Sequence, residues 1–450
     1  MVGVKVYENE NIVIYDNNWN FINLLNGSKL TLSEEEYKAF EKRYELYPYQ
    51  FLSKEKINLI DKYAINKFNV NMNLINKKIE SIQICISCRC NFDCRYCYQN
   101  SYKDLYPKRI LNEDIDSIYK FCMDYNEIAN EKMDIKRIYI SGGETLLKEN
   151  ISTINYIAEI FKDSKISILT NGVNICEFFD ELPINNIFEF RISLDGNFET
   201  INSNLVKTKM SQENYKKILD GIDKVLVNNI KVQINTVVSV SLLNNYQDYL
   251  NILEEKLLNN DNVEIVFTAA YDYSKNNCID ENFMTIEQLL DFMRIFYRNK
   301  GNYKNIHLSL FPDLQSIIDL FEGNLNMENK YNQFSCGYSR GVNFNFYPDK
   351  NVYWCNNYNI DNVVGKYGEN QQIYIEKINN IMFSSPLKNE KCKACIYRYL
   401  CNISCPLRKN IIYSDDGDFC GLLRDYNLIK KIWCIVNNNE YKYNSISKII

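Results

Sequence analysis

Short apolar runs alternate with longer amphipathic stretches between Ser81 and about Asn299. The runs have the length of buried parallel strands, and the stretches between them carry apolar residues at helical spacing. The predicted strands are Ile82–Ser87, Arg137–Ser141, Ile166–Thr170, Phe188–Leu194, Lys231–Val238 and Val263–Thr268. The predicted helices are Glu113–Tyr125, Lys148–Lys162, Gln212–Val227, Leu243–Leu257 and Ile286–Tyr297, with a weak helix around Val173–Phe179. This order predicts an α/β fold, a partial (β/α)6 barrel whose site lies at the C-terminal ends of the strands.

Residues 1–80 have a different pattern and form a separate block. Val4–Tyr7 and Ile12–Tyr15 alternate like short strands, and a capping-box sequence at Ser33 predicts a helix through about Arg43. A second amphipathic helix is predicted over Ser53–Asn66. Small strands followed by helices suggest a winged-helix-like module. An N-terminal extension packed on the barrel fits the same pattern, and both interpretations stay open.

The alternation ends after about Asn299, and cysteines concentrate between Cys336 and Cys420. This change predicts a loop-rich domain that metal organises, because too few apolar runs remain for a large core. The sequence therefore divides into residues 1–80, a core over 81–300, and a bridging and cysteine-rich region over 301–450. A chain of 450 residues is long enough for two or three domains.

The composition and charge of the chain argue against several classes of function. A formal net charge of −5 gives no sign of broad nucleic-acid binding, so we expect no nucleic-acid partner. The first residues lack the pattern of a signal peptide, and no apolar run is long enough to span a bilayer. We therefore expect a cytoplasmic protein with no membrane partner. The 16 cysteines favour metal or redox use over disulfides in that compartment. His307, the one histidine, argues against histidine-based catalysis and is expected to pack within a strand.

Three of these cysteines follow the first predicted barrel strand as C-x3-C-x2-C: Cys90, Cys94 and Cys97. A structural zinc site or an ordinary iron–sulfur cube takes four protein ligands, so three thiolates leave one metal position free. The alternative is a zinc knuckle completed by Cys85 or Cys88.

This segment resembles the radical S-adenosylmethionine (SAM) superfamily, whose hallmark is C-x3-C-x-aromatic-C, with Tyr96 at the aromatic position. The resemblance implies a [4Fe–4S] cluster whose open iron binds the amino and carboxylate groups of SAM. It also implies that one electron from the cluster cleaves SAM to a 5′-deoxyadenosyl radical. The protein's part would be to orient the cofactor and shield the radical.

Further motifs of that family fall at the ends of the next predicted strands. Ser141–Glu144 is similar to its GGE motif, with Gly142 and Gly143 permitting close approach and Glu144 accepting from the SAM ammonium. Thr170, Asn171 and Gly172 are similar to its T-N-G turn, and Ser193–Gly196 to its S-L-D-G motif near the SAM ribose and carboxylate. The resemblance thus makes these residues cofactor contacts: Tyr96, Gly142, Gly143, Glu144, Thr170, Asn171, Ser193, Asp195 and, in place of the carboxylate-binding arginine of many members, Lys207.

The C-terminal cysteines resemble the seven-cysteine SPASM domain, although Lys350 stands where a glycine is usual. In that family two auxiliary [4Fe–4S] clusters bind there, which makes three clusters in all. One would be held completely by Cys392, Cys395, Cys401 and Cys420. The other would have only three ligands, Cys336, Cys355 and Cys405, and a substrate thiolate or Cys278 could supply the fourth. A pair of zinc ribbons is the alternative for this spacing.

Together these features predict a radical SAM/SPASM peptide maturase that forms thioether crosslinks in a ribosomally made, cysteine-containing precursor peptide. Its expected partners are the precursor with its leader and an external one-electron reductant such as flavodoxin or ferredoxin. The block over residues 1–80 is similar to the module that captures a leader as an added strand. The sequence names no catalytic general base.

Two other functions share some of these sequence features. An anaerobic sulfatase-maturing enzyme, which forms formylglycine, would need an aspartate directly after Cys355, where Asn356 stands. A non-catalytic, metal-stabilised scaffold would cleave no SAM.

Overall fold

The structure is a computed structural model of the chain. It describes residues 77–97, 99, 108–254, 257–269, 284–309, 318, 342–355, 363–382, 428, 431, 432, 435 and 436, and the backbone of four short strands within residues 5–31.

A parallel sheet forms the centre of the described chain, and its strands follow one another in sequence order. These strands are β5 (Ile79–Cys85), β6 (Arg137–Ser141), β7 (Lys165–Thr170), β8 (Ile187–Ser193), β9 (Lys231–Val238), β10 (Val263–Ala269) and β11 (Ile306–Ser309). Each pairs in parallel with the next, with Ile84 opposite Ile140 and Ile168 opposite Phe190. The six predicted strands and their order are confirmed. β11, which carries His307, is a seventh.

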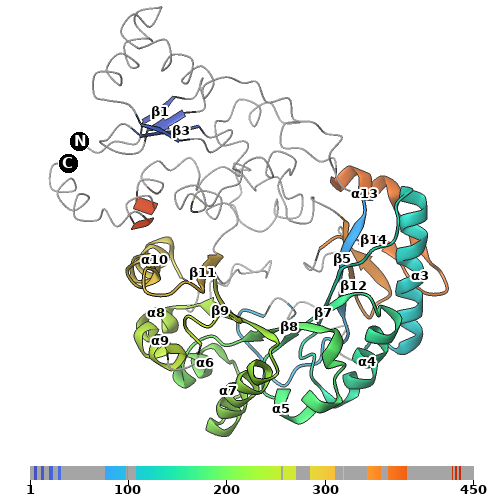
Figure 1. The fold of residues 1–450 in the computed structure, drawn as a ribbon, viewed down its shortest axis with the longest axis horizontal. Coiled ribbons are helices and arrows are strands. Elements are labelled where there is room, and N and C mark those ends of the chain that lie inside the picture. The colour runs from blue at the N-terminus through green and yellow to red at the C-terminus, as the bar shows by residue number, and fades with distance from the viewer. Residues whose placement is uncertain are drawn as a thin grey trace, which may run out of the picture.

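Helices cover the outer side of this arc of strands (Figure 1). They are α3 (Asn112–Ala129), α4 (Ile151–Ile160), α5 (Ile175–Phe178), α6 (Phe198–Asn204), α7 (Gln212–Val227), α8 (Val240–Asn244), α9 (Tyr246–Glu254) and α10 (Ile286–Lys300). Short 3-10 turns lie at η5 (Lys148–Asn150), η6 (Phe179–Glu181) and η7 (Ile184–Asn186). The arrangement confirms the predicted α/β barrel class, whereas α6 and α8 were not predicted.

Alternation along each strand separates an apolar face from a polar one. Residues such as Ile82, Ile138 and Phe190 are fully buried in the core that the helices cover. The next residues along the strands are polar and bond to one another. For example, Glu189 accepts from Ser167 at 2.8 Å and pairs with Arg191 at 2.9 Å. The concave face of the sheet is therefore largely polar.

The sheet continues beyond β5 into the C-terminal third of the chain. β12 (Val342–Phe346) pairs with β5 in parallel, and β13 (Asn351–Tyr353), β14 (Val363–Lys366) and β15 (Gln372–Ile373) follow antiparallel, before α13 (Ile375–Met382). The expectation of a loop-rich region is therefore wrong for these residues. β12 was missed because its pairing partner, β5, lies far away in sequence.

Lys350 occupies the tight turn between β12 and β13. Its φ is 67°, a left-handed conformation that glycine adopts without strain. This explains why a glycine is usual here. The Lys350 ammonium bonds to the carboxylate of Asp114 on α3, which compensates part of the cost.

The first 31 residues contain a four-stranded antiparallel sheet, β1 (Lys5–Tyr7), β2 (Ile12–Ile14), β3 (Asn20–Asn23) and β4 (Lys29–Thr31), in that order. The two short strands predicted there are confirmed. The helices predicted over Ser33–Arg43 and Ser53–Asn66 lie outside the described residues, so the winged-helix-like module stays a prediction.

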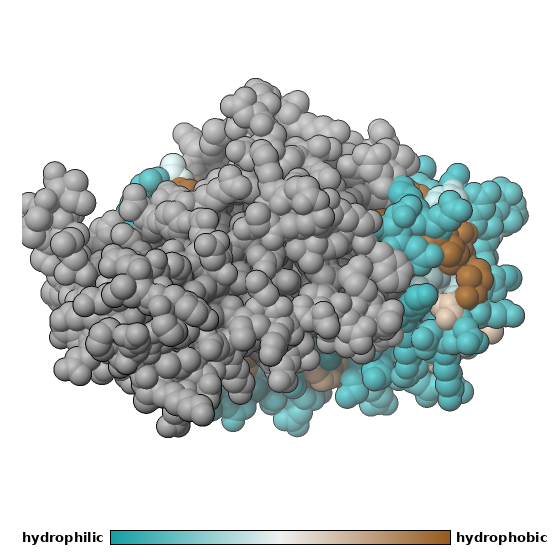
Figure 2. Space-filling model, turned by 90° about the horizontal axis from the view of Figure 1, so that it is seen from above, coloured by the Kyte–Doolittle hydropathy of each residue, from teal (hydrophilic) through white to brown (hydrophobic). Residues whose placement is uncertain are grey.

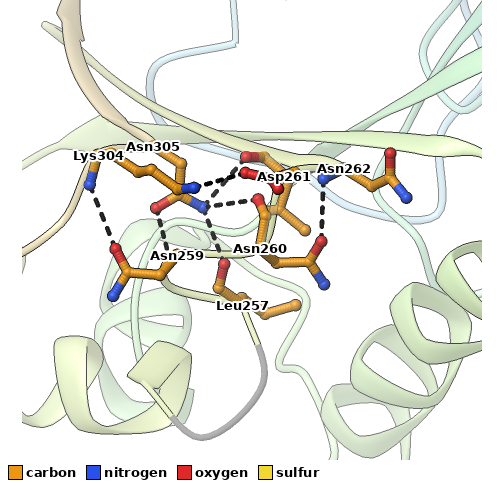
Figure 3. A network of polar contacts seen from close by, with 8 residues as sticks. Leu257, Asn259, Asn260, Asp261, Asn262, Lys304 and Asn305 are labelled. Carbon is orange, nitrogen blue, oxygen red and sulfur yellow. Dashed lines mark hydrogen bonds and ion pairs between the residues drawn. The ribbon is translucent and has the colours of Figure 1, made fainter.

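The N-terminal ends of β8 to β11 border a polar cleft of about 290 Å³, at the end of the barrel opposite the motif turns. The Asn305 amide donates to the Leu257 carbonyl oxygen at 2.8 Å and accepts from the Asn259 N–H at 3.0 Å (Figure 3). This network joins β10 to β11. His307 lies in a strand, β11, as expected. Its side chain lies in the cleft, 49% exposed and 4.0 Å from Glu264, so the expectation of a packing residue is wrong.

The described surface visible in Figure 2 is mostly hydrophilic, with a small hydrophobic group at the end where α3 and α13 lie. Within the described residues, every helix is too short or too polar to cross a membrane.

Candidate active site

Residues 86–97 follow β5 at its C-terminal end and carry Cys90, Cys94 and Cys97; we call this segment the cysteine loop. Burial raises the pKa of the Cys90 thiol to about 12 and raises that of Cys94 well above its ordinary value. The charges of the other cysteines in the loop act in the same direction, so the three groups lie within electrostatic reach of one another. Within the described part of the chain, no three Cys, His, Asp or Glu side chains converge closely enough to hold a metal ion.

The zinc-knuckle alternative requires Cys85 or Cys88. Both residues lie in the buried region where β5 ends and the cysteine loop begins, away from the exposed end of that loop. Both are 1% exposed and pack against Tyr347 and Tyr353. A hydrogen bond with Cys88, together with burial, raises the pKa of the Cys85 thiol well above its ordinary value. Both side chains therefore lie in the core, whereas Cys90, Cys94 and Cys97 are partly exposed.

Gly142 and Gly143, which follow β6, pack directly on the main chain of the cysteine loop. Gly143 donates to the carbonyl oxygen of Ser87 at 2.8 Å, and Glu144 donates to that of Arg89 at 2.7 Å. A Cβ at Gly143 would lie 2.4 Å from the Arg89 oxygen, and one at Gly142 would lie 2.5 Å from the Ser87 oxygen. The glycine pair is therefore required because the cysteine loop itself approaches closely.

The Glu144 carboxylate is 1% exposed and binds the third motif. It accepts from the Thr170 hydroxyl at 2.5 Å, from the Asn171 N–H at 2.7 Å and from the Leu146 N–H at 2.7 Å. Burial raises the pKa of Glu144, and these hydrogen bonds oppose the shift. In this geometry Glu144 positions the Thr170–Gly172 turn. The Asn171 amide then reaches the cysteine loop and donates to Asn91 at 2.7 Å.

The fourth motif ends β8. Ser193 is exposed on the polar face, whereas Asp195 is buried and accepts from the Val237 N–H at 2.9 Å. Burial raises the pKa of Asp195 to about 7, and the hydrogen bond from Val237 opposes the shift. Gly196 has a φ of 142°, and a Cβ there would lie 2.7 Å from the Thr200 side chain.

The chain after α6 runs alongside the cysteine loop. Asp93 accepts from the main-chain N–H groups of Lys207 at 2.7 Å and Thr208 at 3.0 Å. Arg95 donates through its N–H to the Asn204 carbonyl oxygen at 2.9 Å and through Nε to that of Ser203 at 3.2 Å. Lys207 thus meets the loop through its backbone, and its side chain is exposed.

The turns that end β6 and β7 therefore hold the cysteine loop and one another, the chain after α6 contacts the same loop, and the turn after β8 bonds to β9 instead. The structure brings together the predicted contacts Gly142, Gly143, Glu144, Thr170 and Asn171 by direct hydrogen bonds or packing, and Tyr96 lies half-buried in the loop itself. Sequence reasoning missed Asn91, Asp93 and Arg95. Their position between and beside the cysteines was the available signal.

Residues 84–255 match the Radical SAM superfamily, over β5 to α9 and all four motifs. Residues 84–255 are a radical SAM domain. The presence of this domain makes the protein an enzyme.

The curated relatives of the radical SAM domain include GTP 3′,8-cyclase of Campylobacter jejuni (strain RM1221), which is 32% identical over 181 residues. That match covers 40% of this chain and 52% of the relative. GTP 3′,8-cyclase of Clostridium perfringens (strain 13 / Type A) is 31% identical over 166 residues, which are 36% of this chain and 47% of the relative. The chain thus spans about half the length of the curated relatives it matches.

Two solved structures share the fold over most of the chain. One is anSMEcpe with bound AdoMet and Kp18Cys peptide, with a TM-score of 0.54 and 19% identity over 82% of this chain and 99% of that one. The other is Streptococcus suis SuiB bound to the precursor peptide SuiA, with a TM-score of 0.52 and 14% identity over 92% of this chain and 99% of that one.

A radical SAM domain implies a SAM-binding [4Fe–4S] cluster and SAM. The cysteine loop fits this cofactor because three thiols on one loop provide the thiolates of a cluster with one open iron. Of the other predicted ligands, Cys355 is buried directly after β13, and the remaining six lie outside the described residues: Cys336, Cys392, Cys395, Cys401, Cys405 and Cys420.

Proposed function

We propose that this enzyme modifies a ribosomally made, cysteine-containing precursor peptide and forms thioether crosslinks in it. The observation that carries the proposal is the continuation of the barrel sheet into β12–β15 and Cys355. The fold likeness to SuiB covers 92% of the chain, whereas the sequence likeness to the cyclases covers 40% of it. A precursor peptide is what the SuiB structure contains.

In this proposal the motif loops hold the cofactors. Cys90, Cys94 and Cys97 would bind the cluster, and the turns at Gly142–Glu144 and Thr170–Asn171 would fix the cysteine loop beside SAM. When bound, the cluster and SAM supply a 5′-deoxyadenosyl radical. Tyr96, Ser193 and Asp195 would line the SAM site. The polar concave face, with Arg191 and Glu189, would take the main-chain groups of the peptide.

Crosslink formation conserves atoms and electrons. A C–H and an S–H bond of the peptide break and a C–S bond forms. The hydrogen atom goes to the deoxyadenosyl group, the thiol proton goes to a base, and one electron remains. The predicted SPASM cysteines would hold auxiliary clusters that can accept this electron, and the set with only three cysteines, Cys336, Cys355 and Cys405, would leave room for the peptide thiolate. A flavodoxin or ferredoxin would reduce the first cluster.

The N-terminal block is proposed to bind the leader. A four-stranded antiparallel sheet such as β1–β4 has two edges, and an extended peptide gains main-chain hydrogen bonds by joining one of them. This mode supplies affinity for the precursor without contacts to the modified residues.

The test is anaerobic incubation of the reconstituted enzyme with SAM, dithionite and a cysteine-containing precursor encoded beside its gene, followed by mass spectrometry. Thioether formation predicts the loss of two hydrogens per crosslink and protection of one thiol from alkylation. The matched control, Cys97→Ala, should return the peptide unchanged. An aldehyde in place of a cysteine or serine would instead indicate formylglycine formation.

The sequence relatives favour a second candidate, cyclisation of GTP. GTP consumption with 5′-deoxyadenosine formation, and an unchanged peptide, would establish that alternative. The match covers 40% of this chain and 52% of the cyclase, which is why we place this candidate second.

A further inference from the structure

Three basic side chains meet over one aromatic ring at the N-terminal end of the barrel, and we call Arg137, Lys165, Lys231 and Phe188 the Phe188 cluster. The guanidinium carbon of Arg137 lies 4.5 Å from the centroid of the Phe188 ring, and the ammonium nitrogens of Lys165 and Lys231 each lie 5.2 Å from it. The three basic residues are the first of β6, β7 and β9, which brings them to one edge of the sheet. Their positive charges therefore lie within about 10 Å of one another, a range over which solvent ions screen them only partly.

A β-bulge in β8 places Phe188 at the centre of this cluster. The register between β7 and β8 shifts between Ile166 and Ser167, which leaves Phe188 as an extra residue in β8. Lys165 and Lys231 are both exposed, and both ammonium groups lie over the same ring. The ring restricts these two side chains and leaves N–H donors directed away from it. This preorganisation lowers the entropy cost of binding an anion.

The described residues neutralise little of the charge of the Phe188 cluster. Among them, Glu189 is the one carboxylate that pairs with the cluster, at 4.0 Å from Arg137, and it is already paired with Arg191 at 2.9 Å. Within the same part of the chain, Lys165 and Lys231 have no carboxylate at ion-pair distance. Because like charges repel, an anion bound between them would stabilise this end of the barrel.

The Phe188 cluster adjoins the polar cleft of about 290 Å³, which provides space for a ligand. Lys231 and Glu189 line this cleft. The second lysine of the cleft, Lys304, is paired with Asp261 at 2.6 Å (Figure 3), and Asp261 and Glu264 lie on the side of β10. An anionic group would therefore bind on the side of β8 and β9, and the rest of its molecule would lie in the cleft.

We propose that the Phe188 cluster binds the phosphate groups of a diphosphate-bearing small molecule that occupies this cleft. Three cations against one shared carboxylate match a ligand with two or more negative charges, which a diphosphate carries and a single carboxylate group does not. Guanidinium and ammonium groups are both common phosphate ligands. The cluster lies at the end of the barrel opposite the motif turns, so this site is independent of the proposed peptide substrate.

The experiment measures the binding of inorganic pyrophosphate and of ADP to the full-length protein by isothermal titration calorimetry at constant ionic strength. We expect Lys231→Gln to weaken pyrophosphate binding by about tenfold, because one charge-assisted hydrogen bond is lost. Phe188→Leu keeps every charge and removes the ring, and it should weaken pyrophosphate binding by about three- to tenfold. Tighter binding of ADP than of pyrophosphate would identify a nucleotide as the ligand, whereas equal or weaker binding would identify the free diphosphate.

Lys216→Gln is the matched control, because it removes the same charge from a side chain on α7 that is 74% exposed and lies outside the cluster. It should leave the Kd for pyrophosphate within about twofold of wild type. The proposal is overturned if wild type binds pyrophosphate with a Kd above about 1 mM, or if either Lys231→Gln or Phe188→Leu stays within about twofold of wild type. General electrostatic attraction would then account for any binding. If Phe188→Leu does not fold, Lys165→Gln is measured with the same criteria.

Discussion

Gly143 offers a sharp test of how the cysteine loop is held, because an alanine there meets main-chain atoms only. Its Cβ would lie 2.4 Å from the Arg89 oxygen and 2.5 Å from the Cys88 oxygen. Neither oxygen is on a flexible side chain, so the loop itself must shift. Gly143 lies outside the positive-φ residues, which makes the clash the whole perturbation.

The magnitude follows from two contributions. Overpacking of this kind costs about 1–3 kcal/mol. Displacing the loop also weakens the hydrogen bonds from Gly143 to Ser87 and from Glu144 to Arg89, each about 1 kcal/mol. We therefore expect Gly143→Ala to destabilise the radical SAM domain by about 2–5 kcal/mol.

The assay is differential scanning calorimetry of the chain without cofactors, with iron bound per chain after reconstitution as a second readout. Gly143→Ala should lower the Tm of the barrel by roughly 4–20 °C and reduce iron incorporation. The matched control is Gly301→Ala at the end of α10, where a Cβ would meet nothing within 4 Å. That variant should leave both readouts close to wild type. Equal Tm values for the two variants would refute the packing argument.

Three further predictions concern charged groups. Asp195 has a folded-state pKa of about 7 against an ordinary 3.8, so the fold binds the proton more tightly than the unfolded chain. Ionisation therefore destabilises the fold as the pH rises, by up to about 4 kcal/mol above pH 7, and Asp195→Asn should raise the Tm at pH 8 but little at pH 4. Asp93→Ala should release the Lys207–Thr208 backbone and shorten iron retention under chelator, with Asp93→Asn retaining most of it because the amide oxygen still accepts. Arg191→Leu should destabilise the barrel by up to about 3 kcal/mol, because Glu189, with its side chain 8% exposed, loses its 2.9 Å ion pair and keeps the longer one to Arg137 at 4.0 Å; adding Glu189→Leu should restore much of the loss in urea denaturation.

The barrel could be predicted because each strand is short, apolar on its helix-facing side and followed by a helix of matching period. β12 could not be placed in the same way. Val342–Phe346 alternates apolar residues with asparagine, which is typical of a strand, but its partner β5 lies at Ile79–Cys85 and no local pattern reveals that pairing.

The positions of the motif turns could be predicted from their residues alone, but the hydrogen bonds between the turns could not. The sequence predicts that Glu144 accepts a hydrogen bond from the SAM ammonium. It does not show that Thr170 and Asn171 donate to the same carboxylate, because those hydrogen bonds depend on the parallel register of β6 and β7.

The central claim is that a radical formed at SAM abstracts hydrogen from a carbon of a peptide. The most direct measurement is the mass of the 5′-deoxyadenosine formed with a precursor peptide deuterated at its carbon positions. The account predicts that the 5′-deoxyadenosine carries deuterium and appears in proportion to crosslinked peptide. Modified peptide accompanied by unlabelled 5′-deoxyadenosine, or deuterium transfer only from labelled GTP, would contradict it.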